Sequence, residues 1–446
     1  MSKIEVNTVA PQCGTTLTLG ESGDTVTLGS GASQSGFGRT GTVDWDTTAK
    51  TASFTAVSGD GYFVNTTSGA ITATLPASPS AGDIVGFNDY ARTFATNNLT
   101  VARNGSNIQG SASDGVISTN GQSTMFVYVD GTKGWVPTED QTTGNYGAQY
   151  VVATGGTITC CGDYKIHTFT GPGTFTVCSV GNPAGSDTVD YLVVAGGGGG
   201  AARNGGAGGG GAGGYREGYN PGSYTASPLA TTALPVTATA FPITVGGGGA
   251  QFPSANSGQG NAGSNSIFSS ITSTGGGGGG AVSSIAPITV GAAGGSGGGA
   301  GIETDNVPFS CAGAGNTPPV SPSQGNPGGN NFAPTWPSPS GAGGGGGGAG
   351  ASGGNASSGT GGTRGCGVDT GISGSSVNYA QGGGAVNYGS PLGGLGGNNP
   401  TPATTDDGVA GGTNKGGGGG AGGSSSNTGT GAAGGSGIVI IRYKFQ

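Results

Sequence analysis

The chain has 446 residues, of which 108 are glycine and only 8% are charged, and its formal net charge is −8. Ordinary globular domains contain about 7% glycine and about 25% charged residues, so the composition is strongly biased. The pI near 4.5 and the lack of a basic stripe argue against a nucleic-acid partner. No stretch of 18 apolar residues occurs, so we expect no membrane insertion.

The N-terminal segment, residues 1–42, contains the near-repeat LTLGESGDTVTLGSGA, in which short alternating runs flank Gly/Asp turns. Strands this short cannot bury a face alone, which predicts a thin fibre segment in which identical chains wrap or stack. We therefore expect a homo-trimer or another symmetric oligomer. The start, MSKIEVNTVAP, has no apolar signal region. This suggests assembly in the cytoplasm and release by lysis.

Residues 43–140 predict a compact β module, because short apolar runs recur between turn signals as in a sandwich or barrel-like unit. The segment DGTKGW at 130–135 predicts a hairpin with Asp-Gly at its turn. The expected strands cover residues 52–57, 61–65, 70–75, 83–87, 99–103, 124–129 and 134–137. The expected core consists of Phe54, Phe63, Val64, Ile71, Leu75, Ile84, Val85, Phe87, Val101, Phe126 and Tyr128.

Residues 141–446 predict a β domain with a long glycine-rich insertion. Apolar strands are expected within residues 164–195, and the last of them runs into the first glycine tract. The chain closes with the apolar segment GIVIIRYKF at 437–445, which has no apolar partner nearby in sequence. Its natural partner is the sheet within 164–195. Residues 196–436 would then be an insertion between strands that clamp its ends.

The insertion is dominated by glycine, since 80 of the 108 glycines follow Ala195. It shows no helix signal, and strand-like segments are expected at 243–245, 267–272 and 288–290. One interpretation is a flexible linker. The other is a bundle of extended threefold polyglycine helices, which can pack closely without Cβ atoms and exchange backbone hydrogen bonds. We favour the bundle, because a linker would not need to return to a strong closing strand.

The expected fold is therefore all-β plus a polyglycine-helix bundle, without significant helix. Residues 1–42 would form the attachment segment, 43–140 the sandwich-like module and 141–446 the glycine-rich domain.

Nothing in the sequence points to catalysis, and we expect no enzyme activity, no cofactor and no metal site. His167, the single histidine, lies on an expected strand and is interpreted as structural or exposed, with a general base as the alternative. The pairs Asp44/Asp46 and Asp406/Asp407 are interpreted as solvated turns. Metal binding and glycosidase chemistry are the alternatives for those pairs.

The six cysteines show no zinc-binding spacing and are interpreted as buried free thiols. A bridge from Cys178 to Cys160 or Cys161 is the alternative. The full set is Cys13, Cys160, Cys161, Cys178, Cys311 and Cys366.

The ordered motifs HTFTGPGTFTV, DYLVVAGGGGG, ITVGGGGA, GSNSIFSSITSTGGGGGG and SGIVIIRY occur between residues 164 and 445. This set resembles the glycine-rich domain of tailed-phage tail fibres, notably those of marine viruses such as cyanophages. Residues 75–135 also resemble a β module common in such fibres. The glycine-rich half is similar in kind to the tip adhesins of T-even-like phages. That resemblance implies polyglycine helices as a rigid core and variable loops that touch the host receptor.

The resemblance implies a virion tail fibre or fibre-tip adhesin, extracellular after release. Its N-terminus would join other virion tail or fibre proteins, and its glycine-rich end would bind a host surface glycan or outer-membrane protein. A structural fibre or decoration protein without a receptor, and a cellular surface adhesin, remain as alternatives.

Aromatic residues on expected loops are the candidate receptor contacts, because aromatics anchor interfaces. Trp336 is the best single candidate, since Pro334 and Pro337 stiffen its loop. The alternative role of these aromatics is to cover the bundle. The candidates are Trp336, Phe332, Tyr215, Tyr219, Tyr224, Tyr379 and Tyr388.

Overall fold

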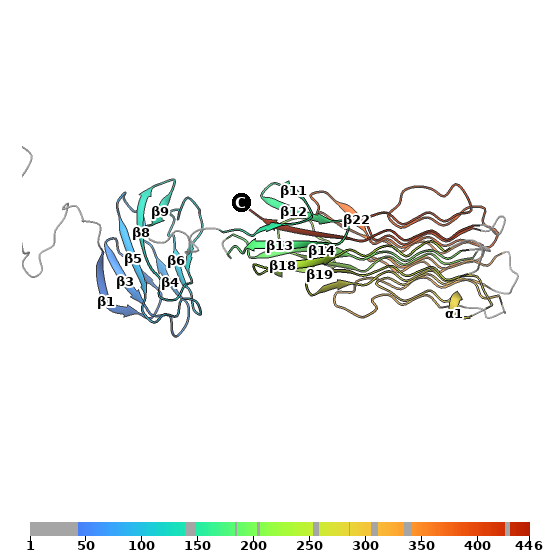
Figure 1. Cartoon of the computed structure of the whole chain (residues 1–446), viewed down its shortest axis with the longest axis horizontal. Coiled ribbons are helices and arrows are strands. Elements are labelled where there is room, and N and C mark those ends of the chain that lie inside the picture. Colours follow the sequence, from blue (N-terminus) through green and yellow to red (C-terminus); the bar gives the residue numbers. More distant parts are fainter. Residues whose placement is uncertain are drawn as a thin grey trace, which may run out of the picture.

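A computed structural model gives the fold as a β-sandwich followed along the chain by a glycine-rich domain (Figure 1). The expected attachment segment, residues 1–42, lies outside the described residues. The structure describes residues 43–138, 149–182, 185–202, 206–252, 258–284, 286–304, 311–333, 340–423 and 429–446.

The sandwich forms because the chain alternates between two facing sheets as it coils around a core. The strands of the first sheet lie in the order β1 (Asp44–Lys50), β3 (Asp60–Val64), β5 (Ile84–Asp89), β8 (Ser123–Asp130) and β9 (Gly134–Pro137). Those of the second are β2 (Phe54–Thr55), β4 (Ile71–Thr74), β6 (Leu99–Ala102) and β7 (Gly115–Ile117). Within each sheet the first three strands pair in parallel, as the alternating path requires.

Alternate side chains of both sheets meet in one core that includes Leu75, Phe87, Leu99 and Trp135. All seven expected strands are present, whereas β1 and β7 were not expected. The expectation that Phe63 is a core residue is wrong. Phe63 is half-buried on the other face of its sheet, where its ring lies 5.0 Å from that of Trp45.

The glycine-rich domain begins with two packed sheets, which we call the clamp. The first contains β11 (Thr157–Cys161), β12 (Tyr164–Phe169), β23 (Ile438–Lys444), β14 (Thr188–Val194), β15 (Tyr215–Tyr219) and β16 (Thr231–Thr232), with β17 (Leu234–Pro235) beside β14. The second contains β10 (Val152–Thr154), β13 (Gly173–Ser179), β18 (Ala240–Thr244), β19 (Ser266–Phe268) and β20 (Ile271–Ser273). The short pair β21 (Val368–Thr370) and β22 (Val377–Tyr379) completes the described strands.

The closing strand β23 lies between β12 and β14 and pairs antiparallel with both. This confirms the expected pairing of the last strand with the sheet that precedes the glycine tracts. One face of β14 and β23 packs against the second sheet of the clamp. The other face, which continues onto neighbouring β15, packs against β21 and β22. Burial on both faces explains why these strands read as continuous apolar runs rather than alternating ones.

Beyond the clamp, the described glycine tracts run side by side as extended chains, which we call the glycine lattice (Figure 1). The tract 196–201 shows how they are joined. The N–H groups of Gly196 and Gly199 donate to the carbonyls of Ser264 and Asn261, so residues three apart bond to one neighbouring tract. In the same way, the N–H groups of Gly197 and Gly200 donate to the tract 432–435, and those of Gly198 and Ala201 donate to the tract 208–211. This threefold repeat is that of polyglycine helices and confirms the ordered bundle.

The same tract also accepts hydrogen bonds from N–H groups in three other tracts, at Gly249, at 276–279 and at 419–422. A chain with six hydrogen-bonded neighbours leaves no space for side chains between tracts. A Cβ atom at Gly198 would meet backbone atoms of Gly276 and Gly277 well inside van der Waals contact. Glycine is therefore required in the lattice for close approach, and not for a turn.

The lattice continues the register of the clamp. Val194 pairs with Ile438 in the antiparallel sheet. Three residues after Val194 and three before Ile438, the N–H of Gly197 donates to the carbonyl of Gly435, so the register is the same. Val194 also pairs with Tyr215, and the same register places Gly198 opposite Gly211. Strands β14, β15 and β23 therefore pass into glycine helices without a slip.

One expectation within the insertion is wrong. Residues 288–290 were expected to be strand-like, but Ala286–Thr289 form the one-turn helix α1 at the end of the lattice farthest from the clamp (Figure 1). The carbonyl of Ile288 accepts a hydrogen bond from the N–H of Ala281, so the turn of helix returns the chain to the adjoining tract.

Candidate binding surface at the free end of the lattice

The end of the lattice opposite the clamp is closed by a small apolar layer. It includes Val282, Ile302 and Val386, which come from tracts far apart in sequence. The residues that directly follow Val282 and Ile302 in sequence, Ser283 and Glu303, form a parallel β-bridge close to the start of α1. We call this layer and the residues around it the distal surface. The remaining members of the layer are Ala201, Ala207, Ala281, Ala333 and Ala421.

Two of the candidate aromatics lie together at the distal surface. Phe332 and Ala342 exchange two backbone hydrogen bonds of 2.8 Å each, and the N–H of Tyr388 donates to the carbonyl of Gly341 at 2.8 Å. Ala342 also bridges to Asn387. Phe332 and Tyr388 are both half-buried, so part of each residue is accessible to solvent. The best single candidate, Trp336, lies outside the described residues.

The four other candidates lie on or beside β15 and β22, and the expectation of a loop position is wrong for Tyr215, Tyr219 and Tyr379, which are strand residues. Tyr215 and Tyr379 are 1% and 4% exposed, so their rings cannot reach a partner. Tyr224 lies on the loop after β15, as expected, and its half-buried ring is 5.9 Å from that of Tyr219. Tyr215, Tyr224 and Tyr379 pack in the apolar cluster on one face of β14 and β23, and not over the glycine bundle.

The buried carboxylate of Glu217 holds two of these tyrosines, Tyr215 and Tyr224. Its two oxygens accept hydrogen bonds from the hydroxyls of Tyr215 at 2.7 Å, Tyr224 at 2.9 Å and Thr370 at 2.5 Å, and from the N–H of Ser227 at 3.1 Å. A buried carboxylate is tolerated when its oxygens are satisfied in this way. The cluster joins β15, the segment after it and β21.

A second buried polar pair crosses the central strands. Asp190 and Arg442 are cross-strand partners in the β14–β23 ladder, and each is less than 5% exposed. Arg442 stacks its guanidinium over the ring of Tyr164 at 4.3 Å and donates to the carbonyl of Ser223 at 2.7 Å. Burial raises the pKa of Asp190 from 3.8 to about 6, although a hydrogen bond from the N–H of Asn220 opposes this.

This pKa has a consequence for stability. Because the folded-state value lies above the unfolded value, Asp190 favours folding below pH 3.8, and its contribution is lost as the pH rises through about 6. Each pH unit between the two values corresponds to about 1.4 kcal/mol, so the ionised group costs up to about 3 kcal/mol at pH 7.

His167 is a structural residue of the clamp. It is fully buried, its Nδ1 donates to the carbonyl of Gly155 at 2.7 Å, and its Nε2 accepts from the hydroxyl of Tyr443 at 3.1 Å. Burial lowers the pKa of His167. The neutral ring therefore favours folding above pH 6.5, and this contribution is lost as the pH falls below that value.

The cysteine expectation is wrong in part. The described cysteines are free thiols, but Cys160, Cys178, Cys311 and Cys366 are exposed rather than buried, and Cys161 is half-buried. Cys160 and Cys161 belong to β11 and Cys178 belongs to β13, strands of different sheets. Cys13 lies outside the described residues.

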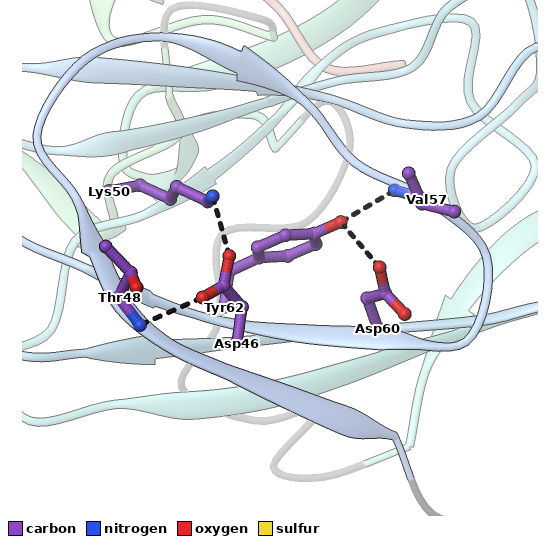
Figure 2. A network of polar contacts seen from close by, with 6 residues as sticks. All are labelled: Asp46, Thr48, Lys50, Val57, Asp60 and Tyr62. Carbon is purple, nitrogen blue, oxygen red and sulfur yellow. Dashed lines mark hydrogen bonds and ion pairs between the residues drawn. The ribbon is translucent and has the colours of Figure 1, made fainter. Parts of the chain in front are cut away.

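The two aspartate pairs make local contacts. Asp44 and Asp46 lie on β1 and not in a turn, because β1 pairs with β3. Figure 2 shows Asp46 bound by the ammonium of Lys50 at 2.7 Å and by the N–H of Thr48 at 2.9 Å. The hydrogen bond from Lys50 holds the pKa of Asp46 below its ordinary value.

In the same network the hydroxyl of Tyr62 accepts from the N–H of Val57 at 2.9 Å and donates to Asp60 at 3.3 Å (Figure 2). The second pair is a turn, as expected, in which Asp407 accepts hydrogen bonds from the N–H and the hydroxyl of Thr430. In the described part of the chain, no three His, Cys, Asp or Glu side chains gather as metal ligands would. None of the helices described there is long and apolar enough to cross a membrane.

Comparison with known families is consistent with this architecture. A family model described as a glycine-rich domain matches residues 168–444, which is more than half of the chain. The chain belongs to this glycine-rich domain family. The match begins inside β12 and ends with the last residue of β23, so it covers the lattice and the clamp strands from β13 onward. No curated protein matches the chain.

Proposed function

We propose that this protein is a tail fibre or fibre-tip adhesin of a tailed phage, and that its distal surface binds the host cell. The observation that carries the proposal is the lattice held in register at one end by the clamp. This arrangement supports a rigid spacer that gathers residues from distant tracts at its free end.

In this architecture, different parts of the molecule provide support and recognition. Interior tracts contribute backbone hydrogen bonds and little side-chain chemistry, so the lattice can hold residues at its end in fixed positions. A preordered surface loses less conformational entropy when it binds, which favours affinity. Half-buried aromatic rings such as Phe332 and Tyr388 offer flat apolar faces to a sugar or a protein pocket.

Cell binding by the purified full-length protein tests the proposal. The double variant Phe332→Ala/Tyr388→Ala should reduce adsorption of the labelled protein to susceptible bacteria at least ten-fold, the effect of about 1.4 kcal/mol. Tyr90→Ala is the matched control, because Tyr90 is a 60% exposed aromatic on the sandwich. Adsorption of the double variant at the wild-type level, with the fold intact, would contradict the proposal.

The assignment to a virion requires a separate experiment. Antibodies against this chain should label the tails of phage particles in electron micrographs. Label on the surface of bacterial cells and none on particles would favour a cellular adhesin instead.

A further inference from the structure

The flank of the glycine lattice carries two adjoining hollows. The first, of about 340 Å³, is lined by Arg364, Gln381, Asn398 and Lys415 among others. The second, of about 320 Å³, lies against glycine backbone and Leu395 and is also lined by Arg364. Because Arg364 lines both, we consider the two together and call them the flank groove. Both volumes are in the range of small-molecule sites.

The amide groups of the flank groove are held in place by their own hydrogen bonds. The backbone N–H of Gln381 donates to Asn398 Oδ1 at 2.8 Å, and the backbone N–H of Asn398 donates to Gln381 Oε1 at 2.9 Å. Asn398 Nδ2 in turn donates to the carbonyl of Asn378 at 3.0 Å. Since the oxygens of both amides are engaged internally, the side-chain NH2 of Gln381 remains to donate to a ligand.

The charged groups of the flank groove are both cations. One nitrogen of Arg364, Nη1, donates to the carbonyl of Gly396 at 2.8 Å, which orients the guanidinium and leaves its other N–H groups available. Lys415 adds an ammonium group. No carboxylate of the described residues forms an ion pair with either side chain. The charged side chains that line the groove are therefore both cations, on a protein whose net charge is −8, and the nearby carboxylate of Asp369 accepts a hydrogen bond from Asn378.

These features define the ligand. A site whose available groups are donors and cations selects an acceptor-rich anion, and the planar guanidinium matches a carboxylate in a bidentate geometry. Pro400 and Leu395 add exposed apolar surface, which can contact the C–H face of a sugar ring. We propose that the flank groove binds an acidic polysaccharide through a uronate-type carboxylate on one of its sugars. This goes beyond the proposed function, because it gives the protein a ligand site separate from the distal surface, and it rests on the adhesin function only for its biological setting.

Calorimetry with the full-length protein tests the proposal. The probe is a hexamer of galacturonate, compared with the same hexamer after full methyl esterification, which removes the charge and keeps the ring. The acidic hexamer should bind at least ten-fold more tightly than the ester, and the difference should shrink at high salt. Arg364→Gln/Lys415→Gln should weaken binding of the acidic hexamer at least ten-fold.

The matched control is Arg216→Gln/Lys133→Gln, which removes the same charge away from the groove and should bind as the wild type does. Lys415→Gln alone breaks no hydrogen bond among the described residues and provides the same test if the double variant does not fold. Equal binding of acid and ester, equal losses in groove and control variants, or no binding of the acidic hexamer would overturn the proposal.

Cell adsorption separates this inference from the proposed function. If the protein adsorbs to cells and Arg364→Gln/Lys415→Gln adsorbs equally well, the groove is not the cell-binding site although the adhesin function stands. If the acidic hexamer binds the groove but the protein adsorbs to no bacterium tested, the groove assignment stands and the adhesin function fails.

Discussion

Replacing a single interior glycine by alanine should destabilise the glycine-rich domain as much as removing a large core side chain does elsewhere. Gly198 is the best position, because its tract is bonded to six others. The added Cβ would meet the backbone carbon of Gly277 at 2.5 Å and the carbonyl oxygen of Gly276 at 2.9 Å. These atoms belong to rigid backbone, so the neighbouring tract has to move.

The size of the effect can be worked out from the bonds at that position. Gly198 donates to the carbonyl of Gly211 and accepts from the N–H of Gly419, each at 2.8 Å. Losing both would cost about 1–3 kcal/mol in all. Overpacking adds about 1–3 kcal/mol. Gly198→Ala should therefore lower the free energy of unfolding by about 2–6 kcal/mol, a large share of the roughly 5–15 kcal/mol of a typical domain.

Gly247→Ala is the matched control in another tract. A Cβ atom at Gly247 has no heavy atom within 4 Å, and the residue is exposed. Alanine there should change stability by less than about 1 kcal/mol, in the stabilising direction, because it restricts the unfolded chain. Urea titration of the full-length protein, read by pulse proteolysis of the glycine-rich domain, measures both variants. Equal midpoints for Gly198→Ala and Gly247→Ala would refute the close-packed lattice.

Three further outcomes follow from the clamp and from the aromatic candidates. Asp190→Asn should stabilise the domain by up to about 3 kcal/mol at pH 7 and by little at pH 4, since burial penalises only the ionised carboxylate. Urea titrations at both pH values measure this, and a difference in unfolding free energy between wild type and variant that does not change with pH would exclude this cause. Deletion of residues 438–446 removes the strand between β12 and β14, so the glycine tracts should become sensitive to protease, whereas unchanged resistance would mean that the lattice needs no clamp. Trp336→Ala should reduce cell adsorption at nearly constant thermal stability; if Trp336 instead covers the lattice, stability should fall by about 3–5 kcal/mol.

The fold class could be predicted from sequence because two strong signals survive without tertiary context. Glycine tracts cannot be ordered by side-chain burial, so either they are linkers or they bond to one another through the backbone. The apolar closing strand at the C-terminus decides between these, because it requires a partner on the far side of the insertion. The structure places it between β12 and β14.

The placement of the aromatics could not be predicted in the same way. Tyr215 follows a glycine tract, which indicates a loop by composition, yet the tract and the strand after it share the register of β14. The alternation in YREGY, with Tyr215 and Glu217 both turned inward, was the available signal. Cys160 was misplaced because β11 is an edge strand, whose residues face solvent.

The flank groove had no signal in the sequence. Arg364, Gln381, Asn398 and Lys415 are brought together only by the pairing of distant tracts, such as the bond from the N–H of Ala380 to the carbonyl of Lys415. No local periodicity records such pairing, since the tracts are nearly uniform in composition.

Hydrogen–deuterium exchange of the full-length protein tests the ordered lattice most directly. If the tracts are bonded to their neighbours as described, the amides of 196–200 should exchange as slowly as those of β14, and the lattice should open with the clamp as one cooperative unit. Exchange of 196–200 at the rate of an unstructured Gly/Ser chain, beside a protected β14, would contradict the rigid support on which the proposed function depends.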